Sequence, residues 1–154
     1  MANPFDFSAG AVLTAAQLNS IGDITDFTPS WTNLTTGNGT YDYKAFLQVN
    51  NLVIVSVSFT FGSTSSMSSN PSFTVPVAVA ETSQLVTGEG LAVEDGGSSY
   101  PLLVNMTSSE LVIYDQAVVG SQVIRSSVTS GSPFTWGTND KIQVTATYFT
   151  GTPS

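Results

Sequence analysis

Residues 52–62 read LVIVSVSFTFG, and apolar side chains recur there at every second position. One face of this stretch is wholly apolar and consists of Val53, Val55, Val57, Phe59 and Phe61. The opposite face carries hydroxyl groups, with Ser56 and Ser58 at its centre. Because successive side chains of a strand point to opposite sides of a sheet, this alternation predicts a half-buried β-strand.

The same period of two residues is found on both sides of this stretch. Residues 41–49 form the preceding run, and Asn50-Asn51 joins the two runs as a tight turn, because asparagine tolerates positive φ. Near the end of the chain, alternating apolar positions are occupied by Ile142, Val144, Ala146 and Tyr148. These segments predict a hairpin and a C-terminal strand within one compact domain.

Further short strands are expected over residues 73–79, 84–93, 99–105, 110–115 and 122–128. Pro76 places the first of them at a sheet edge or bulge, and Gly88 and Gly90 mark a bend in the second. Residues 94–97, Glu-Asp-Gly-Gly, are expected to form a turn. The serine-rich residues 63–72 are expected to form a long polar loop, either a solvated connection or a recognition surface.

The number and spacing of these segments determine the expected fold class. About eight strands, with a turn roughly every ten residues, predict an all-β fold. The expected architecture is an antiparallel β-sandwich, jelly-roll-like, with a short N-terminal helix. Ile54 is apolar on the face opposite Val53, so a second layer or a neighbouring subunit is expected to cover that face too.

The first 28 residues have a different pattern. Thr14 precedes Gln17 by three positions, the spacing of a capping box, and Gly22 is placed to end a helix over residues 11–21. So short a helix is marginal alone and must dock on its own domain or on a partner. The chain is therefore divided into an N-terminal anchor segment, 1–28, and a β-sandwich knob, 29–154. The candidate anchor side chains are Phe5, Phe7, Val12, Leu13, Leu18 and Ile21.

The composition excludes several functional classes. The 154 residues include no histidine and no cysteine, so the usual ligands of zinc, copper, haem and iron–sulfur centres are missing, as are Ser-His-Asp and Cys-His nucleophile systems. With 3 Lys and Arg against 11 Asp and Glu, no nucleic acid partner is expected. The apolar run of residues 52–55 is far shorter than the ~20 residues of a membrane helix, so no membrane partner is expected either.

No catalytic or cofactor site is predicted from the remaining residue types. Glu94 and Asp95 are adjacent carboxylates, but two glycines follow them, which is more typical of a turn than of a glycosidase pair. The spacings of EF-hand and phosphate-binding loops are absent, which leaves an opportunistic calcium site near Asp95 or Asp140 as the open alternative. The chain is therefore expected to be non-enzymatic, without a cofactor or metal.

The aromatic side chains have two interpretations. Exposed rings can bind sugars, and buried rings fill cores. Tyr41 and Tyr43 are expected to share a strand face, while Trp31 and Trp136 lie outside the strands. Core packing is the favoured role for both tryptophans.

Three segments resemble proteins of tailed-phage virions. Residues 8–22, SAGAVLTAAQLNSIG, resemble a segment near the start of fibre and appendage proteins that joins an anchor to the next module. Residues 29–66, which begin PSWTNLTTGNGTYDY, resemble a β-domain of such proteins with a Trp-Thr-Asn-Leu entry and an Asn-Gly-Thr turn. Residues 132–149, SPFTWGTNDKIQVTATYF, resemble the end of that domain.

This resemblance implies a sandwich that often assembles as a homotrimer on the virion surface, with no enzymatic residues to carry over. It predicts a non-enzymatic structural protein of a bacteriophage: a surface knob, short fibre or capsid decoration held by its N-terminus to capsid or tail proteins. The alternative is a receptor-binding module of a tail fibre that recognises a host surface glycan or protein. A glycan-degrading appendage is a third interpretation, and it would require a carboxylate pair in a groove.

Overall fold

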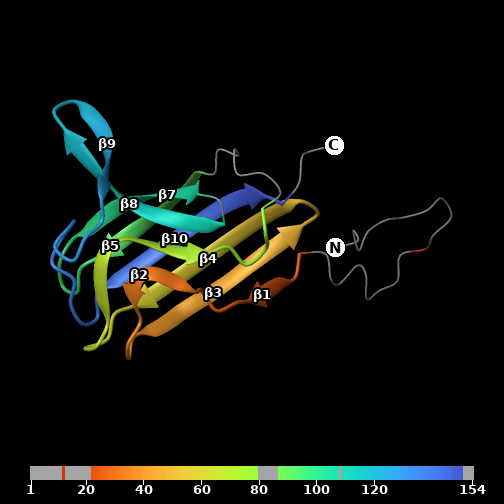
Figure 1. Ribbon diagram of the computed structural model, residues 1–154, viewed down its shortest axis with the longest axis horizontal. Coiled ribbons are helices and arrows are strands. Elements are labelled where there is room, and N and C mark those ends of the chain that lie inside the picture. The colour runs from red at the N-terminus through yellow and green to blue at the C-terminus, as the bar shows by residue number, and fades with distance from the viewer. Residues whose placement is uncertain (1–11, 13–21, 80–86, 108, 151–154) are drawn as a thin grey trace.

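The computed structural model describes residues 12, 22–79, 87–107 and 109–150, and this part of the chain is built from β-strands (Figure 1). The helix expected over residues 11–21 lies outside the described residues apart from Val12. Val12 is also the one candidate anchor residue that is described, and its side chain is exposed. Within the described ranges, no helix is long and apolar enough to cross a membrane.

The described residues form one antiparallel sheet of ten strands. They are β1 (Ile24–Asp26), β2 (Trp31–Thr35), β3 (Thr40–Val49), β4 (Leu52–Thr60), β5 (Ser66–Thr74), β6 (Thr87–Val93), β7 (Ser99–Thr107), β8 (Glu110–Val119), β9 (Gln122–Ser127) and β10 (Lys141–Phe149). The strand order is β1-β3-β4-β10-β6-β7-β8-β5-β2, and β9 pairs with β8 beside this path. The all-β antiparallel class is confirmed, as is the β3–β4 hairpin, in which Asn50 has a φ of 52°.

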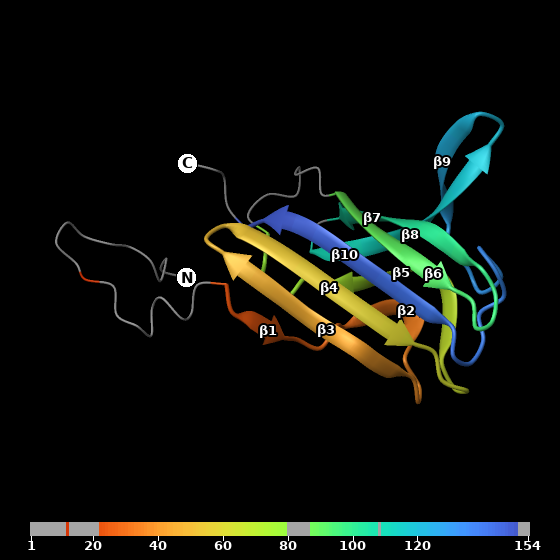
Figure 2. The same ribbon diagram turned by 180° about the vertical axis from the view of Figure 1, so that it is seen from behind.

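The sheet forms a curled half-barrel rather than a clear sandwich, which corrects the expected jelly-roll arrangement (Figures 1 and 2). The reason lies in the link between β1 and β2, which occupy opposite edges of the sheet. Residues 27–30 can span only about 3.5 Å each, so this link holds the two edges near each other. Phe27 bridges them, because its ring lies 6.1 Å from that of Phe46 on β3 and 6.4 Å from that of Phe73 on β5.

The core lies inside the curl and is formed by the apolar faces that the alternation predicts. The five side chains of the apolar face of β4 and its continuation are each at most 2% exposed. β10 pairs with β4 so that Val144 lies opposite Val57 and Tyr148 lies opposite Val53. β4 and β10 therefore contribute their inward side chains to the same buried cluster.

Both tryptophans pack against this core, as predicted. The ring of Trp31 meets that of Phe73 edge-on at 5.0 Å, and its indole N–H donates to the Tyr41 hydroxyl at 2.8 Å. Trp136 stacks on Phe61, with ring centroids 5.0 Å apart. The two indoles are partly buried and extend the aromatic core rather than form an exposed platform.

The serine-rich residues 63–72, expected to form a polar loop, instead contribute most of β5. Inward side chains explain the difference, since Met67 and Phe73 are buried in the core. The Ser72 hydroxyl is buried as well, and it donates to the Glu110 carboxylate of β8 at 2.7 Å. A hydroxyl with a cross-strand partner is tolerated inside a sheet, so a serine-rich stretch can form an interior strand.

The strand expected over residues 73–79 ends at Thr74, the last residue of β5. Pro76 has no N–H to donate, so the ladder cannot continue through it. Both backbone groups of Val77 instead bond the Tyr148 hydroxyl, which accepts from the N–H at 3.2 Å and donates to the carbonyl at 3.0 Å. A side chain thus takes the place of a neighbouring strand.

The other expected strands lie where the sequence predicts them, as β6, β7, β8 and β9, with residues 84–86 outside the described part. Two differences remain. The short strands β1 and β2 were not expected, because neither has a clear alternation. β8 continues to Val119, well past the expected end near Asp115.

The half-barrel has two distinct ends. The described chain enters the sheet at Ile24, opposite Leu47, and leaves it at Phe149, opposite Leu52, so both places lie beside the turn between β3 and β4. We call this the entry end. After Asp115, β8 leaves β7 and continues with β9 as a hairpin that projects from the opposite side of the body, the distal end (Figures 1 and 2).

Candidate functional site

A groove of about 660 Å³ crosses the outer face of the sheet over β10, β6 and β7. Its outward-facing lining consists of Tyr43 from β3, Glu89 and Leu91 from β6, Pro101 and Leu103 from β7, Gln116 from β8, and Gln143 and Thr145 from β10. We call this set the outer-face groove. Its volume falls in the range of about 300–1,000 Å³ that is usual for small-molecule sites.

Small residues on the inner face explain why the outer face is hollow here. Gly90 lies opposite Val144, and Gly88 lies opposite Ala146, both on the inward side of β6. A Cβ at Gly88 would lie 2.8 Å from the Cβ atoms of Ala146 and Val104, so neighbouring strands approach β6 too closely for any side chain. This close packing on the inner face of β6 fits the hollow on its outer face, where Glu89 and Leu91 line the groove.

The groove combines an aromatic ring, apolar surface and neutral polar groups. Tyr43 is 46% exposed at one wall, and Leu91 is 43% exposed. Hydrogen-bonding capacity comes from two side-chain amides, two hydroxyls and one carboxylate: Gln116, Gln143, Thr145, Tyr43 and Glu89. A site of this composition can hold a ligand that presents both apolar faces and hydroxyl groups.

A β-bulge determines which residues of β3 reach the groove. Tyr41 pairs with Phe59 and Tyr43 with Ser58, so one extra residue, Asp42, lies between two consecutive pairs. The bulge corrects the expectation that Tyr41 and Tyr43 share a face. Tyr41 packs against Phe59 in the core at a ring distance of 5.2 Å, whereas Tyr43 lines the groove.

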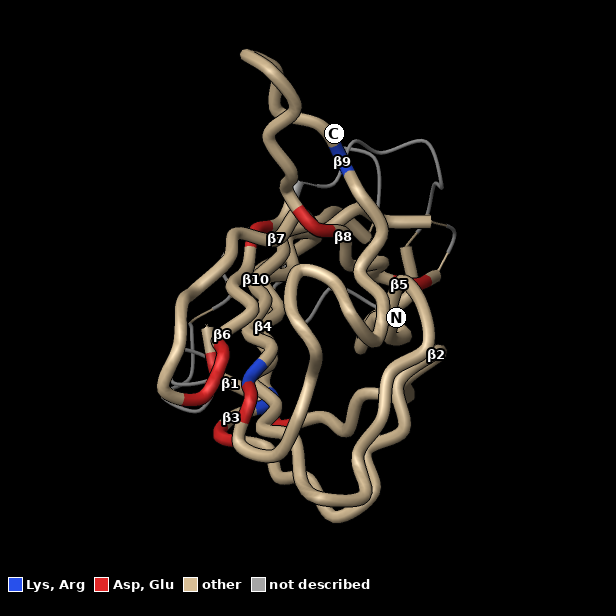
Figure 3. Tube along the Cα trace, turned by 90° about the vertical axis from the view of Figure 1, so that its left-hand side faces the viewer, with Lys and Arg blue, Asp and Glu red and all other residues tan. Residues whose placement is uncertain are grey.

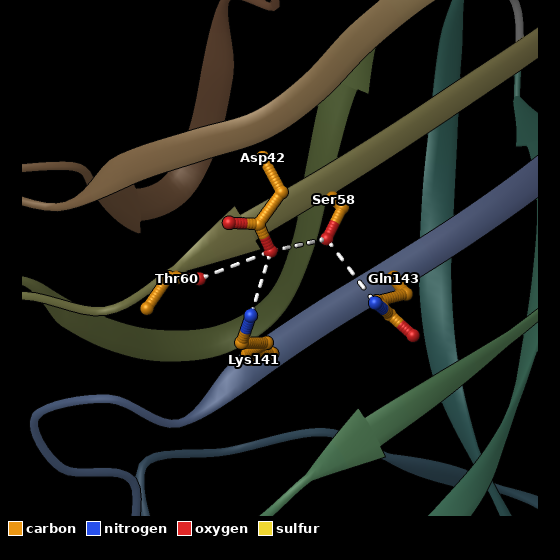
Figure 4. A network of polar contacts seen from close by, with 5 residues as sticks. All are labelled: Asp42, Ser58, Thr60, Lys141 and Gln143. Atoms are coloured by element: carbon orange, nitrogen blue, oxygen red, sulfur yellow. Dashed lines mark hydrogen bonds and ion pairs between the residues drawn. The ribbon is translucent and has the colours of Figure 1, made fainter.

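The bulged residue organises a polar network beside the groove (Figure 4). The Asp42 carboxylate accepts hydrogen bonds from Lys141 at 2.8 Å, Ser58 at 3.1 Å and Thr60 at 3.3 Å. Ser58 in turn accepts from the Gln143 amide nitrogen at 3.3 Å. These contacts neutralise the Lys141 charge and orient the Gln143 amide, with its nitrogen toward Ser58 and its oxygen away from it (Figure 4).

The hydrogen bond from Lys141 is the main cause that lowers the pKa of Asp42. We expect Asp42→Asn to reduce the free energy of unfolding by less than about 1 kcal/mol, because the pair is solvent-exposed. Because the pKa of Asp42 is lower in the folded than in the unfolded protein, its ionised carboxylate stabilises the fold at pH values above the unfolded pKa. This stabilisation is lost as the pH falls through the folded pKa, so the stability difference between wild type and Asp42→Asn should shrink in acid. Urea unfolding at pH 7 and pH 3 measures it, with the exposed Asp23→Asn as control.

Glu94 and Asp95 form the expected turn. The Gly97 N–H donates to the Glu94 carbonyl at 3.0 Å, and Gly96 has a positive φ of 69°. Asp140, the other residue considered for calcium, is buried and accepts from the backbone N–H groups of Asp95 at 2.8 Å and Gly137 at 2.5 Å. Its two oxygens therefore anchor backbone, and the described residues hold no group of three acidic side chains that could bind a metal ion.

A second exposed feature is the distal hairpin of β8 and β9, which residue patterns did not single out. Four large apolar side chains are exposed on it: Val118 at 70%, Val119 at 60%, Val123 at 58% and Ile124 at 40%. Residues 116–128 contain no acidic side chain, and the tip of the hairpin is uncharged in Figure 3. The signal in the sequence was the valine-rich end of β8, which continues past its expected boundary.

Comparisons with known proteins give no further assignment. No protein-family model, no curated protein and no solved structure matches this chain. The outer-face groove and the distal hairpin are therefore interpreted from their own geometry and chemistry.

Proposed function

We propose that this chain is a non-enzymatic structural component of a tailed-phage virion, exposed on the virion surface as a knob, short fibre or capsid decoration. In this proposal the first 22 residues of the N-terminal segment anchor the chain to a capsid or tail protein, because β1 begins at Ile24 and belongs to the sheet, and the β-domain assembles as a homotrimer. The observation that carries the proposal is the distal hairpin, which exposes four branched apolar side chains on a projection from an otherwise well-packed body.

The hairpin supports an assembly role because its apolar surface has no cover within the described chain. A two-stranded hairpin alone is marginally stable in water. Val118 lies opposite Val123 and Ala117 lies opposite Ile124, so both faces of the hairpin are apolar. With a net charge of -8, copies of this chain repel one another, and the segment without acidic residues is where a contact between copies costs least. Burying this surface against further copies would stabilise the hairpin.

The two ends of the half-barrel support an anchored appendage. The chain enters the sheet at the entry end, next to Leu47, while the hairpin projects from the distal end (Figure 1). A partner that holds the N-terminal segment would therefore leave the distal hairpin pointing away from the attachment point. The outward Ile54 on β4 is 36% exposed and offers additional surface for a neighbouring subunit.

Deletion of residues 1–22 is expected to abolish incorporation into particles while the β-domain stays folded. The reason is that β1 begins at Ile24, so the deletion removes no strand of the sheet. Gold labelling of particles with an antibody against residues 41–149 measures incorporation, and circular dichroism of the purified variant checks its fold. Label on the capsid or the tail of wild-type particles identifies the attachment site. Wild-type particles without label, or normal labelling after the deletion, would contradict the proposal.

Replacing Val118 and Val123 together by lysine is expected to convert the assembled protein into monomers. The two side chains share one face of the hairpin, and two buried cations without partners would cost several kcal/mol at an interface. Sedimentation equilibrium measures the mass, and Ser121→Lys at the exposed tip is the matched control, which should stay assembled. A monomeric wild type, or an unchanged mass of the double variant, would refute the assembly role of the hairpin.

An enzymatic appendage makes a different prediction. A depolymerase would release sugars from host polysaccharide, and that activity would be lost on Glu94→Ala or Asp95→Ala if these carboxylates acted as the pair. We expect no release by the wild-type protein, because the two residues form a structural turn.

A further inference from the structure

We infer that the outer-face groove binds a neutral oligosaccharide. The inference deepens the proposed function by giving a virion-surface domain a ligand of defined chemistry, and it rests on that function only for the biological source of the sugar. The groove lies on the face of the sheet, whereas the sequence offered the serine-rich residues 63–72 as the alternative recognition surface.

The position of the groove selects ligands that are recognised through side chains. β10, β6 and β7 each have a hydrogen-bonded neighbour on both sides, so no unpaired strand edge borders the floor of the groove. An extended peptide that binds by strand addition needs such an edge. An amphipathic helix needs a continuous apolar surface, and Gln143, Thr145 and Glu89 interrupt it here.

The charges in and around the groove argue against anionic ligands. Among the described lining residues none is Lys or Arg, and Glu89 contributes a carboxylate. Lys141, two positions from Gln143 on β10, is already bound by the Asp42 carboxylate at 2.8 Å. A phosphate or an acidic sugar would therefore meet the Glu89 carboxylate, in a chain whose net charge is -8. Arg125, which lies opposite Gln116 on β9, is outside the groove lining, and its guanidinium lies over the Tyr114 ring. Neutral, hydroxyl-rich ligands remain.

The lining matches the two surfaces of a sugar ring. The exposed Tyr43 ring and the apolar Leu91 can pack against its C–H face, which is the apolar side of an otherwise polar molecule. The hydroxyl groups of the sugar both donate and accept hydrogen bonds, and the side-chain amides of Gln116 and Gln143 can do the same. The Gln143 amide is held by Ser58, so one recognition group is oriented before the ligand arrives.

The test is titration of the full-length, ¹⁵N-labelled protein with neutral hexasaccharides of glucose, galactose, mannose and N-acetylglucosamine, each to about 20 mM, followed by NMR. We expect saturable shifts with at least one of them at the backbone amides of Gly90, Leu91 and Gln143. An oligogalacturonate of the same length, which is anionic, should cause no such shifts. Tyr43→Ala should weaken binding about fivefold to tenfold, the loss expected for one stacked ring.

Two further variants make the test specific. Gln116→Ala should also weaken binding, and it tests the wall of the groove opposite Tyr43 independently. Tyr114→Ala is the matched control, because this tyrosine lies outside the groove lining, beneath the Arg125 guanidinium at 4.5 Å, and its loss should leave binding unchanged. The inference is wrong if no neutral hexasaccharide shifts the groove amides, or if Tyr43→Ala binds as wild type does. Neither result bears on particle incorporation, so the proposed function and the groove fail independently.

Discussion

Replacing Gly88 by alanine should lower the free energy of unfolding by about 2 kcal/mol, although the change adds a single methyl group. The new Cβ would lie 2.7 Å from the Thr145 carbonyl oxygen and 2.8 Å from the Cβ atoms of Ala146 and Val104. All three are backbone or Cβ atoms, so no side-chain rotation can relieve the contact. Removing a glycine also stiffens the unfolded chain, which favours folding by about 0.4–1 kcal/mol, and the expected loss is what remains after that gain.

Gly131→Ala is the matched control for this prediction. No atom lies within 4 Å of a Cβ built at Gly131, so only the effect on the unfolded chain remains and the free energy of unfolding should stay equal or rise slightly. Urea unfolding followed by tryptophan fluorescence compares the two variants, because Trp31 and Trp136 pack against the core. Equal stability of both variants would mean that the strands around β6 can move apart, and that the glycines do not shape the groove.

The parts of the fold that the sequence predicts are those where one physical rule acts alone. β4 and β10 have one fully apolar face each, so a period of two residues is enough to place their side chains inside the core. The Asn50-Asn51 turn follows from the tolerance of asparagine for positive φ. Hydroxyl-rich β5 was missed because its strand character comes from cross-strand partners such as Glu110, which composition does not reveal.

The curl and the groove depend on contacts between distant segments. The link between β1 and β2 makes the sheet close toward itself, and no local pattern encodes which strands become its edges. The groove needs the β3 bulge, which turns Tyr43 outward, and the inward glycines of β6, which the sequence marked only as a bend. The sequence marks Tyr43 as one of several aromatic residues, but no local pattern shows that β6, β7 and β8 supply the other residues of its groove. Of the six candidate anchor residues, all but Val12 lie outside the described residues.

Tyr148→Phe should destabilise the protein by about 1–3 kcal/mol at neutral pH, the cost of leaving polar groups without a hydrogen bond. The Tyr148 hydroxyl accepts from the Val77 N–H at 3.2 Å and donates to the Val77 carbonyl at 3.0 Å. These bonds hold the segment that follows β5, where the strand ladder has ended. The phenylalanine ring fills the same buried space, so the change removes the hydrogen bonds and leaves the apolar packing in place.

The stability difference between wild type and Tyr148→Phe should become smaller at alkaline pH. Burial raises the pKa of Tyr148 to about 12 from 10.0, and the bond to Val77 offsets this only in part. The unfolded chain therefore loses the proton first, and the wild-type protein loses stability by about 1.4 kcal/mol per pH unit as the pH rises from 10 to 12. The variant lacks this titration, whereas Tyr41, whose pKa is also raised by burial, titrates in both proteins. The stability difference between wild type and variant should thus shrink as the pH rises from 8 to 11.

Guanidinium unfolding of both proteins at pH 8 and pH 11 measures this convergence. Tyr43→Phe is the control, because Tyr43 is exposed on the outer face and its hydroxyl should contribute less than about 0.5 kcal/mol at pH 8. If the difference between wild type and Tyr148→Phe stays constant from pH 8 to pH 11, the Tyr148 hydroxyl titrates equally in the folded and unfolded chains. It would then be accessible to water in the folded protein, and its bonds to Val77 could not be what holds the segment after β5 against the half-barrel.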